Sequence, residues 1–314
     1  IKKRIICAIA VILALASILW LATLMLVPKY VSQSREGNLV AEYYDELETG
    51  NTHQVLFVGD CEVYESFVPA VLWEKYGITS YVRGSAQQLI WQSYYLLREM
   101  LEYETPDVVV FNVLSMKYGE PQSEAYNRMT IDGMRWSENK VGTIKASMTE
   151  EENFASYIFP LLRFHSRWKE LSREDIKYMF TRDKVAYNGY MIQTNIKPQE
   201  SMREGAELFD YTLPSTAFEY LDKMRELCDE KGVELVLIKS PTNTWKYWWY
   251  DEWDAQICDY ADEYGLDYYN FIDNEEIGLD WSRDTYDAGV HLNVWGAEKM
   301  TMYFGEILAE KYGV

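Results

Sequence analysis

The chain has 314 residues, which is long enough for one large α/β domain with insertions. Of these residues 48% are hydrophobic and only 8 are proline, so the composition excludes a disordered or fibrous protein. The net charge of −20 argues against nucleic acid as a partner. Four cysteines and three histidines without CxxC or HxxxH spacing make a structural zinc site a poor explanation, and we expect neither a metal nor a cofactor.

The N-terminal segment predicts a membrane anchor. Lys2, Lys3 and Arg4 precede the uncharged run 5–27, whose 23 residues (27 − 5 + 1) form a helix about 35 Å long. That length crosses a hydrocarbon core of about 30 Å, and basic residues before the run favour a cytoplasmic N-terminus. A cleaved signal peptide is the alternative, but its apolar stretch is shorter and ends at a small-residue site. We therefore expect residues 1–28 to anchor the chain in the cell membrane, with one span that contacts the bilayer through residues 5–27 and an extracellular main domain.

Strands and helices alternate after this anchor. Residues 29–52 are polar and predict a stalk with a short lead-in helix, and residues 53–314 form the main domain. Short apolar runs that end at glycines or polar residues predict buried parallel strands at 54–58, 79–83, 107–111, 234–238 and 267–271. Between them, apolar residues at helical spacing predict helices, which end near Pro106, Gly232 and Gly265, and a closing helix lies around 300–308. The pattern predicts a three-layer α/β/α sandwich with about five mostly parallel strands.

An insertion at about 116–217 interrupts this pattern. It contains a predicted helix near 150–170 and an Asn188-Gly189 pair that suits a type I′ hairpin turn. The segment is too long for a simple crossover, so we expect it to cover one end of the sheet.

The loops after the strands carry residues of a nucleophile–base set. Ligands of open parallel sheets bind at the carboxyl ends of the strands. Cys61 follows the first strand, and His291 lies before the last helix with Asp287 four residues earlier. We expect His291 to take the Cys61 proton and Asp287 to orient the imidazole, with Asp284 as a second candidate. Gly84 and Asn112, after the second and third strands, are candidate oxyanion donors.

Each of these residues also has a structural interpretation. Cys61 could be a small buried residue or a disulfide partner of Cys228 or Cys258. His291 could be a capping or core histidine, and Asp287 could cap a turn. Asp60 could brace its loop through backbone bonds. His165, flanked by Arg163 and Arg167, is a candidate substrate-binding residue or a member of a structural ion pair.

The motifs resemble those of the SGNH (GDSL) hydrolase superfamily over about 54–115 and 219–314. Gly59-Asp60-Cys61 is similar to the family's Gly-Asp-Ser block, and Gly84, Asn112 and the Asp–His pair stand where later blocks are expected. The resemblance implies a flavodoxin-like fold, a nucleophile at position 61, and an oxyanion hole that includes Gly84 and Asn112. Three features depart from the family pattern. Cysteine replaces serine, the final block reads Asp-x-x-x-His instead of Asp-x-x-His, and no aspartate follows Asn112.

More narrowly, the chain is similar to a membrane-anchored branch of Gram-positive bacteria that resembles the D-alanine transfer protein of teichoic acids and the alginate-type O-acetylation proteins. This resemblance implies a membrane-bound O-acyltransferase as a partner and a cell-surface glycan as the substrate. Trp248 and Trp249 lie in an aromatic loop after the fourth strand, where indoles could stack on sugars, pack against the insertion or meet the membrane interface.

The resulting prediction is an extracellular SGNH-like acyltransferase or esterase that acts on O-acyl groups of cell-surface polysaccharide through Cys61, His291 and Asp287. The alternative is an inactive subunit that binds glycan or holds an O-acyltransferase.

Overall fold

A five-stranded parallel sheet forms the centre of the molecule. The computed structural model describes residues 2–28, 36–181, 184, 187–199, 203–204, 211–243, 245–246 and 250–314. The sheet has the order β2-β1-β3-β5-β7, and every neighbouring pair is parallel. Its strands are β1 (Val55–Gly59), β2 (Ser80–Gly84), β3 (Val108–Asn112), β5 (Glu234–Lys239) and β7 (Asp267–Asn270). The five predicted strands are therefore confirmed to within one residue at each end.

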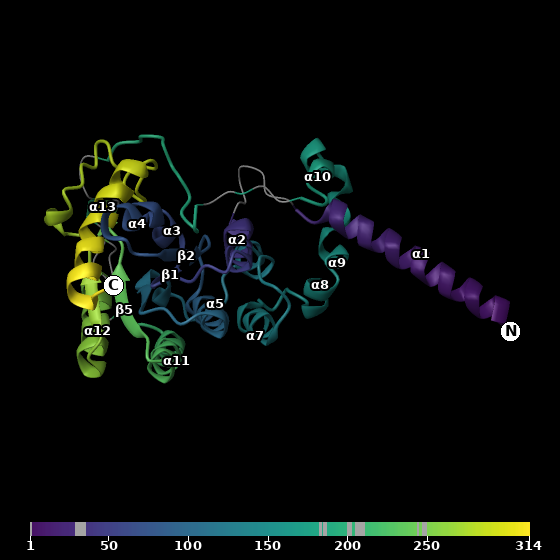
Figure 1. Cartoon of the computed structure of the whole chain (residues 1–314), viewed down its shortest axis with the longest axis horizontal. Helices are drawn as coiled ribbons and strands as arrows, with labels where there is room; N and C mark the ends of the chain where they lie inside the picture. The colour runs from purple at the N-terminus through teal and green to yellow at the C-terminus, as the bar shows by residue number, and fades with distance from the viewer. Residues whose placement is uncertain are drawn as a thin grey trace.

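Helices cover both faces of this sheet, as Figure 1 shows. Side chains alternate along β1, so that Leu56 and Val58 pack into one apolar core while Val55 and Phe57 pack into the other. The first core includes residues of α2, α5, α11 and α12, and the second includes residues of α3, α4 and α13. Since each face of the sheet has its own buried cluster, the predicted three-layer α/β/α arrangement is confirmed.

The main helices are α3 (Cys61–Tyr64), α4 (Pro69–Tyr76), α5 (Ile90–Tyr103), α11 (Ser215–Lys231), α12 (Tyr250–Tyr264) and α13 (Val294–Ile307), which continues as the π-helical turn η4 (Leu308–Tyr312). Helices α5, α11 and α12 end where the sequence predicts, α13 begins six residues before the expected closing helix, and α3 and α4 were not predicted. Gly232 ends α11 with a φ of 69°, and Gly265 follows α12 with a φ of 68°, a left-handed conformation that glycine adopts without steric cost. Short 3₁₀ turns lie at η1 (Val113–Lys117) and η3 (Glu275–Ile277).

The predicted stalk contains a helix that packs on the domain. Within 29–52, α2 (Glu36–Glu48) buries Tyr43 and Tyr44 against the sheet. Their hydroxyls donate to Glu104 and Glu99, each at 2.7 Å. Glu99 also pairs at 2.7 Å with Arg83, whose side chain is fully buried beneath both tyrosine rings. The lead-in helix thus belongs physically to the α/β domain.

The insertion is built from short helices. It contains α6 (Glu124–Ile131), α7 (Glu138–Ser147), α8 (Phe154–Ile158), α9 (Leu161–Phe164), η2 (His165–Lys169) and α10 (Arg173–Lys177). The predicted helix near 150–170 is wrong as a single element, because the chain turns at Phe159 and Pro160 between α8 and α9. Helices α6 and α7 contact α2 and α5, so this half of the insertion covers helices and not an end of the sheet.

The second half of the insertion does reach the carboxyl end of the sheet. Asn188 and Gly189 have φ angles of 51° and 86°, as the predicted type I′ turn requires, although residues 185 and 186 lie outside the described residues. Residues 190–199 then run across the loops of that edge, with Met191 N–H bonded to Tyr64 O at 3.0 Å and Lys197 N–H to Thr285 O at 3.0 Å. A parallel pair of two-residue strands, β4 (Arg203–Glu204) and β6 (Trp245–Lys246), lies farther along the chain.

Helix α1 (Lys2–Leu26) projects from the rest of the molecule (Figure 1). Among the described residues it is the one helix long and apolar enough to cross a membrane, which is consistent with a single-pass anchor. The C-terminal end of α1 contacts α9, η2 and α10 of the insertion.

Candidate active site

The strand order places the candidate residues at a topological switch point. From β1 the chain passes to β2 on one side, and β3 then returns to the other side of β1. The carboxyl ends of β1 and β3 therefore flank the crevice where open α/β sheets bind ligands. Cys61 opens α3 directly after β1, and Asp60 caps that helix by accepting the Glu62 N–H at 3.1 Å.

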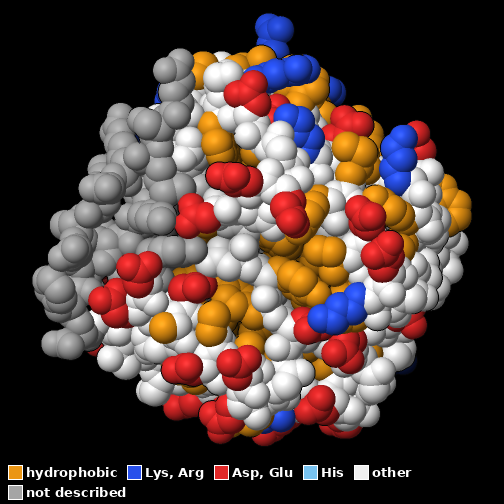
Figure 2. All heavy atoms as spheres, turned by 90° about the vertical axis from the view of Figure 1, so that its left-hand side faces the viewer, with side chains coloured by type: hydrophobic (Ala, Val, Ile, Leu, Met, Phe, Trp, Pro, Cys, Tyr) orange, Lys and Arg blue, Asp and Glu red, His pale blue; other side chains and the backbone are white. Residues whose placement is uncertain are grey.

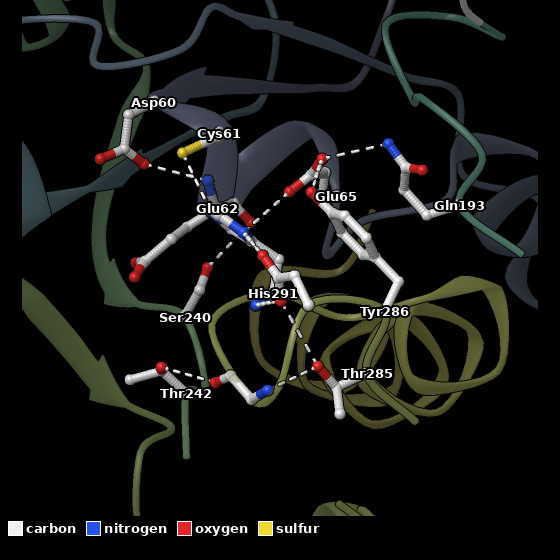
Figure 3. Close-up of polar contacts among 12 residues, drawn as sticks. Asp60, Cys61, Glu62, Glu65, Gln193, Ser240, Thr242, Thr285, Tyr286 and His291 are labelled. Carbon is white, nitrogen blue, oxygen red and sulfur yellow. Dashed lines mark hydrogen bonds and ion pairs between the residues drawn. The ribbon is translucent and has the colours of Figure 1, made fainter. Parts of the chain in front are cut away.

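Cys61, His291 and Asp287 form one continuous chain of contacts. His291 Nε2 lies 3.1 Å from Cys61 Sγ, and His291 Nδ1 lies 2.7 Å from Asp287 Oδ2. The contact between Cys61 and His291 is drawn in Figure 3. Cys61 is a free cysteine at a partly exposed position, and it stands in direct contact with His291, so the parts of a nucleophile–base–orienter set are assembled here.

The loop between Asp287 and His291 explains how the longer Asp-x-x-x-His spacing works. Ala288 and Gly289 both adopt left-handed φ angles, 69° and 86°, and fold the loop so that Asp287 Oδ1 also accepts the His291 N–H at 2.9 Å. A Cβ on Gly289 would lie 2.9 Å from Asn243 O, so this position requires glycine. The loop thus fits one extra residue while the carboxylate keeps its contact with the imidazole.

Asp284 belongs to an ion pair and does not contact His291. Its carboxylate is fully buried, and Oδ2 accepts the Lys299 ammonium at 2.6 Å and the Asp280 N–H at 2.8 Å. Of the two candidates, Asp287 is therefore the one that contacts the imidazole.

Glu65 is a second carboxylate beside His291 that the sequence analysis missed. Its Oε2 lies 3.4 Å from His291 Nδ1, and its Oε1 accepts the Tyr286 hydroxyl at 2.8 Å and approaches the Gln193 amide at 3.5 Å (Figure 3). Glu65 ends the short helix α3, one turn after Cys61. A carboxylate four residues after the nucleophile, on the same face of a helix, is the sequence signal that could have identified it.

Burial and charge set the protonation of the site. Burial raises the pKa of Cys61, although the neighbouring His291 opposes this shift. Burial alone would lower the pKa of His291, but Cys61, Glu65 and Asp287 together raise it well above its usual value. Burial would likewise raise the pKa of Asp287, but its bonds to His291 lower it. The pKa of Glu65 rises to about 7, mainly because the carboxyl is buried.

The amide of Asn112 is held by carboxylates in this structure. Asn112 Nδ2 donates to Glu62 Oε2 at 2.9 Å and to Asp60 Oδ1 at 3.3 Å, so both amide hydrogens have acceptors. An amide has only these two donors. In this structure Asn112 therefore has no amide hydrogen left to donate to an oxyanion. Cys61 is the first residue of α3, and the first amide hydrogens of a helix have no acceptors within the helix. The Cys61 N–H is therefore the kind of donor that an oxyanion hole uses.

A buried ion pair lies beneath the nucleophile loop. Lys239, at the end of β5, is fully buried, and its ammonium lies 2.8 Å from each oxygen of Glu62 and 2.8 Å from Ser240 O. All three hydrogens of the ammonium thus have acceptors. A lysine that ends a buried apolar strand requires a buried acid, which is the signal for this pair in the sequence.

Gly84, Asp60 and His165 are further residues that the sequence predicts at the site, and none of them forms a hydrogen bond or ion pair with His291. A Cβ on Gly84 would lie 2.9 Å from Gly59 O and 3.1 Å from Asp60 O, so glycine lets β2 approach the nucleophile loop closely. Asp60 braces that loop, and burial with the nearby Glu62 raises its pKa to about 6. His165 is exposed where α9 meets η2, beside α1 and at the opposite end of the molecule from α3 and α13 (Figure 1). The structure therefore excludes His165 from this site.

Two further expectations concern the aromatic loop and the cysteines. Trp248 and Trp249 lie outside the described residues. Cys228 is a buried free thiol and Cys258 an exposed one, so neither forms a disulfide with Cys61 or with the other.

Comparisons with known proteins find solved structures that are similar at low sequence identity. A family model matches residues 206–312, and its description names no activity. No curated protein matches the chain. A Bacteroides fragilis protein described as an acylhydrolase is similar in structure, with 12% identity and a TM-score of 0.44 over 90% of this chain and 100% of that one. A GDSL-like lipase from Bacteroides thetaiotaomicron gives 11% identity and a TM-score of 0.43 over 88% of this chain and 98% of that one.

Proposed function

We propose that the chain is a membrane-anchored acyltransferase or esterase of the SGNH type that acts on O-acyl groups of cell-surface polysaccharide. The observation that carries this proposal is the line of contacts from Cys61 Sγ through the two nitrogens of His291 to Asp287 Oδ2, at 3.1 and 2.7 Å. Thiol, imidazole and carboxylate in this order are the parts of a nucleophilic acyl-transfer site.

The proposed reaction has two half-reactions. His291 Nε2 takes the thiol proton while Sγ attacks the acyl carbonyl, and the tetrahedral intermediate expels the first alcohol, which receives that proton from His291. The acyl group is now a thioester on Cys61. A second hydroxyl then attacks the thioester, with His291 again as base, and releases the thiol. When the second hydroxyl belongs to a sugar the reaction is transfer, and when it belongs to water the reaction is hydrolysis.

The charges around His291 support transfer of the thiol proton to the imidazole. Burial raises the pKa of Cys61 while the neighbouring His291 opposes this shift, and the thiol proton passes to His291 as the sulfur attacks. Asp287 and Glu65 stabilise the imidazolium that forms at that moment. The same arrangement serves a hydroxyl nucleophile, which is the residue type that the SGNH pattern has at this position.

The anchor and the surface charge support the proposed location and substrate class. α1 would hold the domain at the outer face of the cell membrane, beside a membrane-bound O-acyltransferase that supplies the acyl group. Figure 2 shows acidic side chains spread over the face that it presents, in agreement with the net charge of −20. Long-range steering would therefore repel a strongly anionic acceptor, which favours local recognition of a sugar hydroxyl.

Replacement of the nucleophile tests the mechanism. Cys61→Ala should lower turnover of a p-nitrophenyl acyl ester by about 10³-fold or more, as for other triads, and abolish glycan acylation in cells that depend on the protein. Cys61→Ser should keep measurable activity, because general-base attack also works with a hydroxyl. Cys258→Ala, which removes an exposed thiol elsewhere, is the matched control and should behave as the wild type. Full activity of Cys61→Ala would refute the mechanism.

A second candidate is an inactive subunit that binds glycan or scaffolds the O-acyltransferase. The observation that favours it is the amide of Asn112, which Glu62 and Asp60 occupy, so that the oxyanion hole lacks one side-chain donor. In that case Cys61→Ala would be silent in cells, while deletion of residues 5–27 would abolish acylation.

A further inference from the structure

Exposed apolar side chains lie on the helices that pack against the C-terminal end of α1. We call residues 154–181, which contain α8, α9, η2 and α10, the collar. Helices α9, η2 and α10 each contact α1, and α8 contacts α9. Six large apolar side chains of the collar are 46–70% exposed: Ile158, Phe159, Leu162, Trp168, Ile176 and Phe180. Soluble surfaces rarely gather so many large apolar side chains, and such patches are typical of protein or membrane contacts.

The exposure of α1 changes where the collar begins. Residues 2–21 are exposed without interruption, whereas residues 22–28 are partly or fully buried. Lys2, Lys3 and Arg4 begin this exposed part, so its uncharged portion comprises residues 5–21, which are 17 residues (21 − 5 + 1) or about 26 Å of helix, a few ångströms less than a hydrocarbon core of about 30 Å. The collar therefore covers α1 near the level at which a membrane-spanning helix leaves the hydrocarbon.

Direct contacts hold the collar on this part of α1. Arg167 donates to Leu26 O at 2.6 Å, an acceptor at the end of α1 that the helix itself does not use, and pairs at 3.0 Å with Asp175 of α10. The rings of Phe180 and Trp20 lie 6.1 Å apart, so the far end of the collar reaches one to two turns down α1 from Leu26. Tryptophan at this level of a span is typical of the membrane interface.

The charge of the collar differs from that of the whole chain. Residues 154–181 contain five basic residues (Arg163, Arg167, Lys169, Arg173, Lys177) and three acidic ones (Glu170, Glu174, Asp175), a balance of 5 − 3 = +2 within a chain of −20. Lys169 and Arg173 are exposed beside the apolar side chains. Basic residues together with exposed Trp, Phe and Leu are the composition of helices that lie in an interface of anionic lipid.

We propose that the collar lies in the outer leaflet of the bilayer, with its six apolar side chains among the lipid acyl chains and its basic side chains at anionic headgroups. This inference rests on the proposed anchoring by α1. Two attachments, the span and the collar, then fix the orientation of the domain. The candidate site around α3 and α13, at the far end of the molecule from α1 in Figure 1, faces away from the membrane.

Spin labels on the full chain in vesicles with anionic lipid test the proposal. The background has Cys7, Cys61 and Cys258 replaced by serine and keeps the buried Cys228. Each variant then carries one new cysteine for the label, at Leu162 or Ile176 in the collar, at Leu15 in α1, or at Glu230 on α11. Oxygen, which partitions into lipid, and a water-soluble nickel chelate report the surroundings of each label. We expect a several-fold higher oxygen-to-nickel accessibility ratio at residues 162 and 176 than at 230, close to the ratio at 15.

The reference positions separate the possible failures. A lipid signal at 15 with a water signal at 162 and 176 would overturn the collar proposal and leave the anchor intact. A water signal at 15 would refute the anchor and the collar together. Shielding of 162 and 176 from both reagents would also overturn the proposal, since a second copy of the chain would then cover the collar.

Discussion

Glu65 couples the chemistry of the site to the stability of the fold. Its carboxyl is 2% exposed and faces His291, Tyr286 and Gln193. Its pKa of about 7 lies above the value of 4.5 that applies without these surroundings. Between these values the folded protein holds a proton that the unfolded chain releases, so this group makes the folded state less stable as the pH rises through the window. The raised pKa of His291 acts in the same direction, because its stabilisation is lost as the pH rises.

The first prediction concerns this dependence. A shift from 4.5 to about 7 corresponds to a loss of at most about 3 kcal/mol of unfolding free energy between pH 5 and pH 8. The glutamine side chain of Glu65→Gln is neutral at every pH, so this variant should lose less unfolding free energy between pH 5 and pH 8 than the wild type. Urea unfolding of the full chain in detergent at several pH values measures the slope, and Glu74→Gln, an exposed acid on α4, is the control. Equal slopes for Glu65→Gln and wild type would contradict the prediction.

Single residues also show where sequence reasoning reached its limit. The types and order of Cys61, Asp287 and His291 predicted their proximity, because the ends of parallel strands meet at one edge. Asn112 also lies at that edge, but the direction of its amide depends on Glu62 and Asp60, which compete for the same hydrogens. Of the two interpretations of His165, substrate binding does not hold, because the flanking Arg167 binds Leu26 and Asp175 and so belongs to a structural ion pair.

At the scale of elements, the Lys239–Glu62 pair joins β5 to α3. The two side chains lie 2.8 Å apart and are 0% and 3% exposed, so solvent does not screen them. Removal of one partner of such a pair leaves an uncompensated buried charge. The pair also fixes Asn112 through Glu62 Oε2.

Lys239→Met should therefore destabilise the fold by about 3–5 kcal/mol, because Glu62 loses its partner. Combining it with Glu62→Gln should recover part of the loss, since the neutral amide still accepts the bond from Asn112. Lys231→Met at the exposed end of α11 should stay within about 0.5 kcal/mol of wild type. Urea unfolding compares these three variants and Glu62→Gln alone, so that the loss in the double variant can be set against the sum of the two single losses. Additive losses in the double variant would contradict the coupling.

Elements differ in how well local sequence predicts them. α5, α11 and α12 are long, with an apolar stripe and a Pro or Gly stop, so their periodicity is visible. α8, α9 and α10 have only four or five residues each, too few for a helix to be stable by propensity. Their stability depends on caps, such as Ser172 on α10, and on packing against each other and α1. The sequence near 150–170 therefore resembles one helix, although it forms several short ones.

At the scale of the whole molecule, α2 completes the domain. Tyr43 and Tyr44 cover the buried Arg83–Glu99 pair, and Tyr43 also binds Glu104, which accepts the His53 backbone N–H at 2.8 Å. Loss of α2 would expose one face of β2 together with these charges. The folded unit therefore extends to residue 36, within the segment expected as a stalk.

Truncations test this extent. A chain that begins at residue 36 should express as a folded, cooperatively unfolding protein, whereas one that begins at residue 53 should aggregate or unfold at a much lower temperature. Thermal unfolding followed by circular dichroism compares the two. Within the longer chain, Tyr43→Ala should cost about 3–5 kcal/mol, as for other large buried aromatic side chains. Similar unfolding temperatures for the two truncations would restore the stalk interpretation.

The sequence by itself determined the parallel sheet, the helices that end at Gly or Pro, the apolar span, and the edge at which Cys61 and His291 meet. These features depend on local periodicity and on a rule of topology, both of which are readable along the chain. Only the tertiary structure decided which carboxylates face His291, how Ala288 and Gly289 fit the longer spacing, and that part of the insertion packs against the C-terminal end of α1. These features depend on contacts between residues far apart in sequence, where burial and competition for hydrogen bonds select one partner among several.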